Sequence, residues 1–391
     1  MVGHGTIREV AMQDPTMPPT AKDLSKMKEL TETAMKEGAF GISTGLEYVP
    51  GRFADMNELV ELAKIAGKNG GFYASHIRDE QVGVLDAIAE AIEVGAKSGT
   101  SVQISHVKAC GAEVWGYGQT ISSMISLARS LGVDVTADQY PYAASSTGFS
   151  QAFPSWALEG GIEKLKERLA DPALSSRIRA YAKNQIGIRV GNDLSLIQIA
   201  SYKANSNWEG KTMADILKER GKEPTLDKGI DLVIEMYLSG GPSIIYHYIN
   251  LDDIKVLMRN PYVMVASDGD IREYGSGAPH PRNYGSFPRV LSYYVKDQYI
   301  LTMEEAIKKM TSMPAKKLSI KDRGVIKPGN WADIVIFNEN EIKDTATFFN
   351  PHQYPLGIKY VIVNGTLTAK DGKHTGKATG KVLYGPGKIG K

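Results

Sequence analysis

The stretch FYASHIRDE, residues 72–80, decides the fold, because its apolar run ends at His76 and the chain then becomes charged. Thirty residues later the stretch VQISHVKAC, residues 102–110, ends a second apolar run at His106. Short apolar runs bounded by polar residues are typical of buried strands. We therefore expect two buried strands, each of which carries one imidazole at its carboxyl end.

Helices and strands alternate around these two runs, from residue 20 to residue 142. Thr20 and Asp23 predict a capping box for a helix that ends near Lys36, and Asp55 is suited to cap a helix that ends near Lys68. Further helices are expected at 82–97 and 119–131, and strands at 38–45, 71–76, 101–106 and 133–140. Strands separated by helices lie parallel, which favours either a barrel or an open doubly wound sheet.

The rest of the chain departs from this rhythm. Residues 143–242 are polar and rich in predicted helix, and we interpret them as an insertion that covers the functional site. Regular strands resume at 242–249 and 262–270. Beyond residue 323, alternation with period two and Asn-Gly and Asp-Gly turns predict a small β domain, so the expected domains are 1–322 and 323–391.

Composition excludes several classes of function. Lysine and arginine number 46 against 44 acids, and the net charge of +2 gives no electrostatic reason to bind nucleic acid or an anionic membrane. No apolar run reaches the length of a transmembrane helix, and the start has no signal-peptide pattern. Cys110 is the only cysteine, which excludes an internal disulfide and fits a reducing, cytoplasmic compartment.

Four polar side chains stand at the ends of predicted strands, namely His76, His106, Tyr140 and Asp268. The carboxyl ends of the strands in a parallel barrel share one mouth, so these side chains are expected to meet in one cavity. Imidazole and carboxylate are usual zinc ligands, and an Asp beside an activated water is suited to act as general base. A lone His after a strand is more often a structural residue, and the repeated placement is what favours a metal site.

The chain resembles the N-acyl-D-amino-acid deacylase (D-aminoacylase) family of the amidohydrolase superfamily in six segments that follow the family's order: STGLEYVPG, ASHIRDE, ISHVKACG, ADQYPY, ASDGD and HPRNYGSFPRVL. The resemblance implies an α/β fold, a metal-dependent (β/α)8 TIM-type barrel with a small accessory β-sandwich at the C-terminus. The opening VGHGTIREV reads as the end of a strand already under way and matches about the third barrel strand. The expected barrel is therefore N-terminally incomplete, with strands three to eight and an exposed edge that a second chain or an oligomer would cover.

The resemblance also assigns roles to residues. His76 and His106 become the metal ligands on strands five and six, and Asp268 becomes the strand-eight carboxylate that takes a proton from the attacking water. Lys108, Tyr140 and Arg282 match positions around the substrate carboxylate, where a guanidinium offers a two-pronged donor. Tyr48 matches a tyrosine near the scissile acyl group, where a phenol can donate to the developing oxyanion. A solvated surface charge is the alternative interpretation for Lys108 and Arg282.

The chain departs from the family pattern at the metal site. The family carries a His-x-His pair on strand one and a metal-bridging Cys, whereas the seven histidines here include no pair two residues apart. Cys110 lies four residues beyond His106, and we interpret it as a free thiol. Two protein ligands are fewer than the three or four that zinc normally takes. We therefore expect one of three cases: the chain is a fragment, it is completed by another chain, or it has lost catalysis.

The other histidines are assigned to structural roles. His4 is expected either at a strand end that faces the cavity or in structural packing, and His247 in the interior. His280 is expected to shape the position of Arg282, and His352 and His374 are expected to be incidental. Phe149, Phe153 and Trp156 of the insertion are expected to form an apolar wall of the side-chain pocket, which favours an apolar D-amino acid.

The predicted function is a zinc-dependent hydrolase that cleaves the amide bond of N-acyl-D-amino acids, with a small-molecule substrate as its partner. A cyclic amidase of the hydantoinase or dihydroorotase kind is a weaker alternative, because those enzymes usually bridge two metals with a carboxylated lysine and no strand obviously offers one. The alternative from a different class is an inactive remnant that acts as a binding or assembly partner. Loss of the His-x-His pair favours the remnant, and retention of Asp268, Lys108, Tyr140 and Arg282 favours the enzyme.

Overall fold

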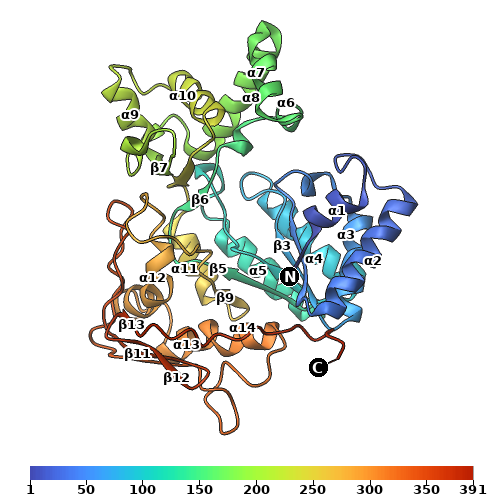
Figure 1. Cartoon of the computed structure of the whole chain (residues 1–391), viewed down its shortest axis with the longest axis vertical. Helices are drawn as coiled ribbons and strands as arrows, with labels where there is room; N and C mark the ends of the chain where they lie inside the picture. The colour runs from blue at the N-terminus through green and yellow to red at the C-terminus, as the bar shows by residue number, and fades with distance from the viewer. Residues whose placement is uncertain (391) are drawn as a thin grey trace.

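A six-stranded parallel sheet lies at the centre of the computed structural model, which describes residues 1–390 (Figure 1). The strand order is β1-β2-β3-β4-β5-β9, and all neighbouring pairs are parallel. The strands are β1 (Val2–Gly3), β2 (Gly41–Gly45), β3 (Phe72–His76), β4 (Val102–Ile104), β5 (Val135–Gln139) and β9 (Val263–Val265). This is the expected α/β barrel-type sheet.

The register of the sheet aligns the carboxyl ends of its strands. Gly45 at the end of β2 pairs with His76 at the end of β3, and Gln139 at the end of β5 pairs with Val265 at the end of β9. Residues that follow these strands therefore emerge at one edge of the sheet. Both histidines and Asp268 belong to that edge.

Outside the insertion, the helices up to residue 259 connect the parallel strands and pack on their neighbours in order, and, within residues 1–390, three further α-helices follow β9. They are α1 (His4–Ala11), α2 (Ala21–Glu37), α3 (Met56–Lys68), α4 (Val84–Ser98), α5 (Gly118–Ser130), α11 (Leu251–Arg259), α12 (Arg282–Arg289), α13 (Met303–Met310) and α14 (Ser312–Lys317). The Thr20–Asp23 capping box begins α2, and Asp55 accepts from the backbone N–H of Glu58 at the start of α3. Both caps confirm the sequence prediction.

The first segment, VGHGTIREV, was expected to be the end of a strand, and β1 does end there, at Gly3. The helix α1 that begins at His4 was not predicted. The apolar residue Ile7 of this helix is buried against the sheet, and Arg8 is buried beside Glu58. Spacing of three to four residues is the helical period, which nine residues are too few to reveal.

The insertion forms a separate unit that lies at the top of Figure 1. Its helices are α6 (Ser155–Leu158), α7 (Gly161–Ala170), α8 (Pro172–Val190), α9 (Met213–Glu219) and α10 (Leu226–Leu238). Its antiparallel sheet has the order β6-β8-β7, with β6 (Ser145–Thr147), β7 (Ile197–Ser201) and β8 (Ser243–Tyr246).

Strand β8 corrects the expectation that regular strands of the main unit resume at residue 242. It pairs antiparallel with β6 and β7, so it closes the insertion instead of joining the parallel sheet. Ile244 and Ile245 point to opposite faces and are both fully buried. An apolar run of this kind suits any strand that is covered on both faces, so the sequence alone does not say which sheet receives it.

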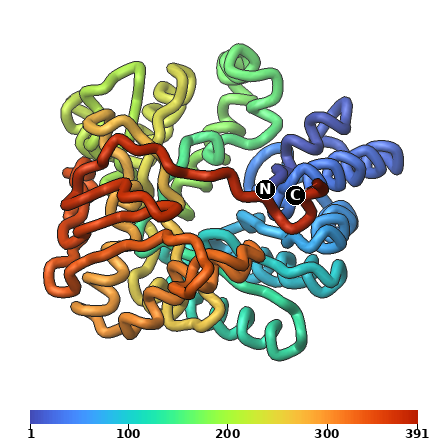
Figure 2. The backbone as a smooth tube through the Cα atoms, turned by 60° about the horizontal axis from the view of Figure 1, so that its bottom comes forward, coloured from blue at the N-terminus to red at the C-terminus, as the bar shows by residue number. Residues whose placement is uncertain are grey.

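The C-terminal part forms a four-stranded antiparallel sheet, as the turn signals predicted. Its strands are β10 (Ile334–Phe337), β11 (Ile358–Val363), β12 (Thr366–Lys370) and β13 (Lys373–His374). The last residues then run back to the N-terminal helices, as the red segment in Figure 2 shows. There Gly385 N–H donates to the Gly38 carbonyl at 2.8 Å, and Ile389 N–H donates to the Lys36 carbonyl at 3.1 Å. Within residues 1–390, no helix combines the length and apolarity needed to cross a bilayer.

Candidate metal centre

The two histidines predicted as ligands meet at the carboxyl edge of the parallel sheet. His76 is the last residue of β3, and His106 follows β4 by two residues in a left-handed conformation with φ 38°. Asp138 of β5 holds this turn, because its Oδ1 accepts the backbone N–H of His106 at 2.8 Å. Burial, and to a smaller extent the charge of Asp268, raise the pKa of Asp138. The hydrogen bonds from His106 and Gln103 lower this pKa, but burial outweighs them.

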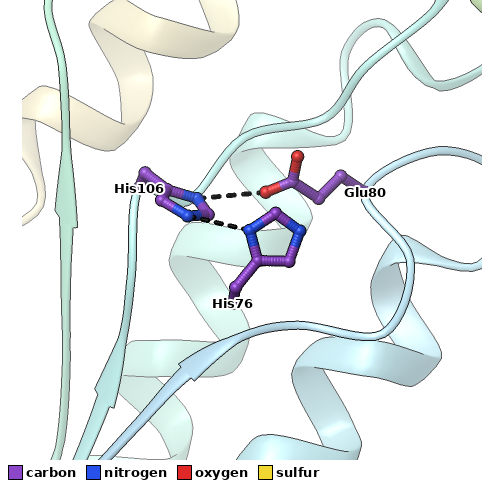
Figure 3. Close-up of side chains that lie close together, drawn as sticks. All are labelled: His76, Glu80 and His106. Atoms are coloured by element: carbon purple, nitrogen blue, oxygen red, sulfur yellow. Dashed lines mark hydrogen bonds and ion pairs between the residues drawn. The ribbon is translucent and has the colours of Figure 1, made fainter. Parts of the chain in front are cut away.

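The imidazoles face one another edge to face (Figure 3). His76 Nδ1 lies 2.9 Å from His106 Nε2, and the ring centroids are 4.6 Å apart with an interplanar angle of 71°. The two nitrogen atoms are close enough for one ion to contact both. This convergence is the arrangement that the repeated strand-end histidines predicted.

A carboxylate stands behind each imidazole. Glu47 Oε2 lies 3.0 Å from His76 Nε2, and Glu80 Oε1 lies 3.1 Å from His106 Nδ1. Carboxylates that accept the second ring N–H of a histidine fix its tautomer and orient the other nitrogen toward a metal. The atoms left to bind an ion are therefore His76 Nδ1 and His106 Nε2.

The donor set fits a zinc ion. One ligand atom from each of His76, Glu80 and His106 lies within 4.8 Å of the others. Two imidazoles and a carboxylate form a known protein donor set for catalytic zinc. Glu80 Oε1 is already engaged by His106 and Lys108, so Glu80 would reach an ion through its other oxygen. An ion at His106 Nε2 would require a lone pair on that nitrogen, whereas His106 Nδ1 lies 3.1 Å from Glu80 Oε1 and 2.9 Å from the donor Lys108 Nζ.

Lys108 forms a buried ion pair beside the histidines. Its Nζ lies 2.5 Å from Glu80 Oε1, 3.0 Å from the His106 carbonyl oxygen and 2.9 Å from His106 Nδ1. Burial alone would lower the pKa of Lys108, but the charge of Glu80 outweighs it and raises that pKa. Burial likewise opposes the charge of Glu80, and Lys108 and the histidines lower the pKa of its carboxyl. Both groups therefore carry charge at neutral pH.

Tyr140 lies between two cations. Arg282 Cζ is 4.7 Å and Lys108 Nζ is 5.6 Å from the centroid of its ring. Lys108 is 6% and Arg282 is 8% exposed, so the interpretation of either as a solvated surface charge is wrong. The buried Tyr140 hydroxyl has no hydrogen-bond partner within residues 1–390. Two cations and an unpartnered hydroxyl together form a site suited to a carboxylate.

Asp268 follows β9 and belongs to the same cluster. It adopts a left-handed conformation with φ 49°, and its Oδ2 lies 2.8 Å from Arg282 Nη1. Arg282 is held in turn by His280, because Nδ1 of His280 accepts the backbone N–H of Arg282 at 3.0 Å. The expected role of His280 in shaping the position of Arg282 agrees with this contact.

Tyr48, from the loop after β2, packs against His76 with its ring tilted by 51°. Its ring centroid lies 4.8 Å from that of His76. Burial on the side of the site, and then the charges of Glu47 and Glu80, raise the pKa of Tyr48 to about 12. The phenol therefore keeps its proton at neutral pH and remains a hydrogen-bond donor.

The remaining histidines are placed outside this centre. His4 is fully buried and its Nε2 contacts Glu58 at 2.6 Å, and His247 Nε2 contacts Gln198 at 3.1 Å, so both are interior residues. His352 was expected to be incidental, but its Nδ1 accepts from the Tyr284 hydroxyl at 2.8 Å, which links α12 to the C-terminal part.

Two other side-chain expectations concern the insertion and the thiol. Cys110 is a buried free thiol, and burial raises its pKa. Phe149 and Phe153 are each 1% exposed in the core of the insertion, and Phe153 packs on Tyr237 at 4.6 Å between ring centroids. Neither ring offers a free face, so the expected apolar pocket wall loses these two residues. Trp156, the third, is only partly buried, and Arg177 Cζ lies 4.9 Å from the centroid of its ring.

Three residues of the site escaped the sequence analysis, namely Glu47, Glu80 and Arg189. Glu80 follows His76 by four residues and Glu47 precedes Tyr48, so both were visible as acids beside a candidate residue. Arg189 gave no signal, because it lies 142 residues from Glu47, to which its Nη2 donates at 3.0 Å.

The chain is similar to known amidohydrolases over most of its length. A family model described as an amidohydrolase family matches residues 227–369. N-acyl-D-glutamate deacylase of Alcaligenes xylosoxydans xylosoxydans is 32% identical over 365 residues, which are 93% of this chain and 65% of that protein. D-aminoacylase of the same organism is 31% identical over 383 residues, which are 98% of this chain and 69% of that protein.

A solved structure shows the same relationship. The crystal structure of N-acyl-D-glutamate deacylase from Bordetella bronchiseptica, complexed with zinc and a phosphonate inhibitor, superposes with a TM-score of 0.76 at 31% identity. The match covers 95% of this chain and 69% of that one. The chain thus spans about two thirds of the length of the relatives that it matches.

Proposed function

The chain belongs to the N-acyl-D-amino-acid deacylase (D-aminoacylase) family of amidohydrolases, and on this premise we propose that it hydrolyses the amide bond of N-acyl-D-amino acids. The products are a carboxylate and a free D-amino acid. The observation that carries the proposal is the convergence of His76 and His106, each backed by a carboxylate, beside the buried cations Lys108 and Arg282.

The substrate carboxylate binds at the cationic end of the site. Arg282 and Lys108 supply the positive charge, and the Tyr140 hydroxyl donates the hydrogen bond that it lacks in the free protein. Binding there draws Arg282 toward the substrate and loosens its pairing with Asp268. Substrate binding therefore frees the carboxylate that the reaction needs as a base.

The amide bond is then hydrolysed next to the histidines. A zinc ion held by His76 and His106, with Glu80 within reach, supplies Lewis-acid chemistry when it is bound. Asp268 takes one proton from the attacking water while the water oxygen bonds to the acyl carbon. Tyr48 donates a hydrogen bond to the carbonyl oxygen as negative charge develops on it. Asp268 returns the proton to the leaving nitrogen as the C–N bond breaks.

We also propose the division of the chain into a barrel unit, 1–322, with its insertion near 143–242, and an accessory unit, 323–391. The parallel strands all end by Val265 and the antiparallel C-terminal sheet begins at Ile334, which supports the division. The identity to deacylases over nearly the whole chain favours the deacylase over the cyclic amidase and the inactive remnant.

The test is amine release from a panel of N-acetyl-D- and N-acetyl-L-amino acids, with His76→Asn as the variant. His374→Asn is the matched control, because His374 is exposed in the C-terminal sheet. We expect D-selective release that His76→Asn abolishes and His374→Asn retains. Turnover that is unchanged in His76→Asn would refute the assignment, and absence of turnover on every member of the panel would favour the remnant. The panel also reports which side chain is preferred.

A further inference from the structure

A buried arginine of the insertion reaches the histidine pair. Arg189 lies at the end of α8 and is 4% exposed. Its Nη1 donates to the Gln185 carbonyl and to Gln185 Oε1, both at 3.0 Å. Its Nη2 is thereby directed outward from the helix, and it donates to Glu47 Oε1 at 3.0 Å. Glu47 belongs to the loop after β2, so this bond joins the insertion to the barrel.

Glu47 has a different partner on each oxygen. Oε1 accepts from Arg189, and Oε2 lies 3.0 Å from His76 Nε2. A carboxylate accepts and never donates, so the proton between Oε2 and the ring belongs to His76 Nε2. The lone pair of His76 is then on Nδ1, which faces His106. The orientation of Glu47 therefore decides which nitrogen of His76 is free to bind an ion.

We propose that Arg189 is a positioning residue for His76, which acts through Glu47. This inference rests on the proposed function only in taking the histidine pair as the metal site. Arg189 fixes one oxygen of Glu47, so the other oxygen stays directed at the ring. The insertion then contributes to metal binding without contacting the metal.

The end of α8 is fixed tightly enough to serve this purpose. Gly111 follows the His106 loop with φ 97°, and a Cβ there would lie 2.7 Å from the Ile188 carbonyl oxygen. Gly111 N–H also donates to the Tyr248 carbonyl at 2.9 Å. The loop that carries His106 therefore lies directly against the residue before Arg189. The loop after β2, which carries Glu47, and the loop after β4, which carries His106, therefore both contact the C-terminal end of α8.

A purely structural role would leave a different signature. A buried ion pair adds little net stability compared with apolar residues of similar size, so stability alone does not explain the pair. A partner behind a ligating histidine affects metal affinity about 10–100-fold. The tautomer of His76 and the zinc affinity are therefore the quantities to measure.

The experiment compares Arg189→Met with a matched control on the same helix. Arg179→Met removes an arginine whose Nη1 contacts Asp231 at 2.6 Å on the exposed face. Imidazole ¹⁵N shifts of the metal-free protein, at mildly alkaline pH where imidazole is neutral, report the tautomer of His76. We expect a single Nε2–H tautomer in the wild type and in Arg179→Met, and a mixture of tautomers in Arg189→Met. The zinc dissociation constant should rise about 10–100-fold in Arg189→Met alone.

Glu47→Gln gives a sharper variant. Arg189 only donates, so it holds the amide oxygen of the substituted side chain and leaves the amide NH2 facing His76. His76 Nε2 must then accept, and its proton moves to Nδ1, which blocks metal binding. Adding Arg189→Met frees the amide to rotate and restores part of the original tautomer. The double variant also keeps no unpaired charge, so it is the variant to measure where Arg189→Met fails to fold.

The outcomes separate the proposal from its premise. The proposal would be overturned if folded Arg189→Met kept the wild-type tautomer of His76 and the wild-type zinc affinity. It would also be overturned if the fold-loss of zinc affinity in the double variant equalled the product of the fold-losses in the two single variants, because the residues would then act independently. A double variant no weaker than Glu47→Gln supports it. The tautomer of His76 is measured without metal or substrate, so this part of the test is independent of whether the protein hydrolyses an amide.

Discussion

Removal of Lys108 should destabilise the protein strongly, because Glu80 would remain buried without its main counter-charge. The side chains of Lys108 and Glu80 are 7% and 4% exposed, and Nζ lies 2.5 Å from Oε1. At an effective dielectric constant of about 20, that separation corresponds to an attraction of roughly 7 kcal/mol, which the desolvation of the two ions largely offsets.

The expected loss in Lys108→Met is therefore smaller than the attraction. Removing one partner of a buried pair costs about 3–5 kcal/mol, because the other charge stays in place. Glu80 keeps its contact with His106 at 3.1 Å, so we expect about 3 kcal/mol. Replacement of both residues by Met should restore most of this loss, since no unpaired charge then remains.

The assay is urea unfolding followed by circular dichroism, with Lys26→Met as the control. Lys26 lies 3.0 Å from Glu29 in an exposed ion pair, for which a change under about 1 kcal/mol is expected. A loss under about 1 kcal/mol in Lys108→Met would refute the reasoning, as would a double variant as unstable as the single one.

The same pair sets a dependence of stability on pH. The folded-state pKa of Glu80 is lowered, so its contribution is fully present above the unfolded pKa of about 4.3 and is lost as pH falls toward the folded value. The unfolding free energy of the wild type, relative to that of the double Met variant, should therefore fall as pH drops below about 4. A relative stability that did not fall there would contradict the buried ion pair.

Three further predictions concern other parts of the chain. Gly111→Ala should displace the end of α8, since the new Cβ would lie 2.7 Å from the Ile188 carbonyl oxygen. We expect the zinc affinity to fall as a result, and a zinc affinity equal to that of the wild type would contradict the close approach. Lys309 is buried, and burial lowers its pKa to about 8. The wild type should therefore gain stability relative to Lys309→Met as pH rises from about 8 toward 10. A difference in urea midpoint between the two proteins that does not change with pH would contradict this prediction. Gly385→Ala should release the C-terminal segment from α2, because the new Cβ would lie 2.1 Å from the Ala39 carbonyl oxygen. A protease should then remove that segment faster than in the wild type. Equal rates of cleavage would contradict this contact.

The sequence predicted what local patterns determine. Thr20 and Asp55 cap helices through bonds to backbone three residues away, and the apolar runs before His76 and His106 become neighbouring parallel strands. Their alignment at one sheet edge follows from parallel pairing alone. Parallel pairing accounts for the meeting of the two histidines, and the resemblance to the deacylase family is what assigned them as metal ligands.

The rest depended on contacts between distant segments. Strand β8 is as apolar as a barrel strand, and only its partners β6 and β7 assign it to the insertion. Arg189 resembles any other charged residue of a solvent-facing helix until the fold brings it to Glu47. Phe149 and Phe153 were read as pocket residues because aromatic character does not distinguish a pocket wall from the core of the insertion. Tertiary packing, which no local pattern encodes, made each of these assignments.

The most direct test of the central claim is removal and restoration of the metal in one preparation. The purified protein would be stripped with a chelator, assayed for amine release from an N-acetyl-D-amino acid of the preferred class, and assayed again after addition of zinc. The histidine pair at the edge of the sheet predicts that release stops on stripping and returns with zinc, and that His106→Asn does not recover. Release that continues after stripping, or that returns equally in His106→Asn, would contradict the assignment of His76 and His106 as the metal site.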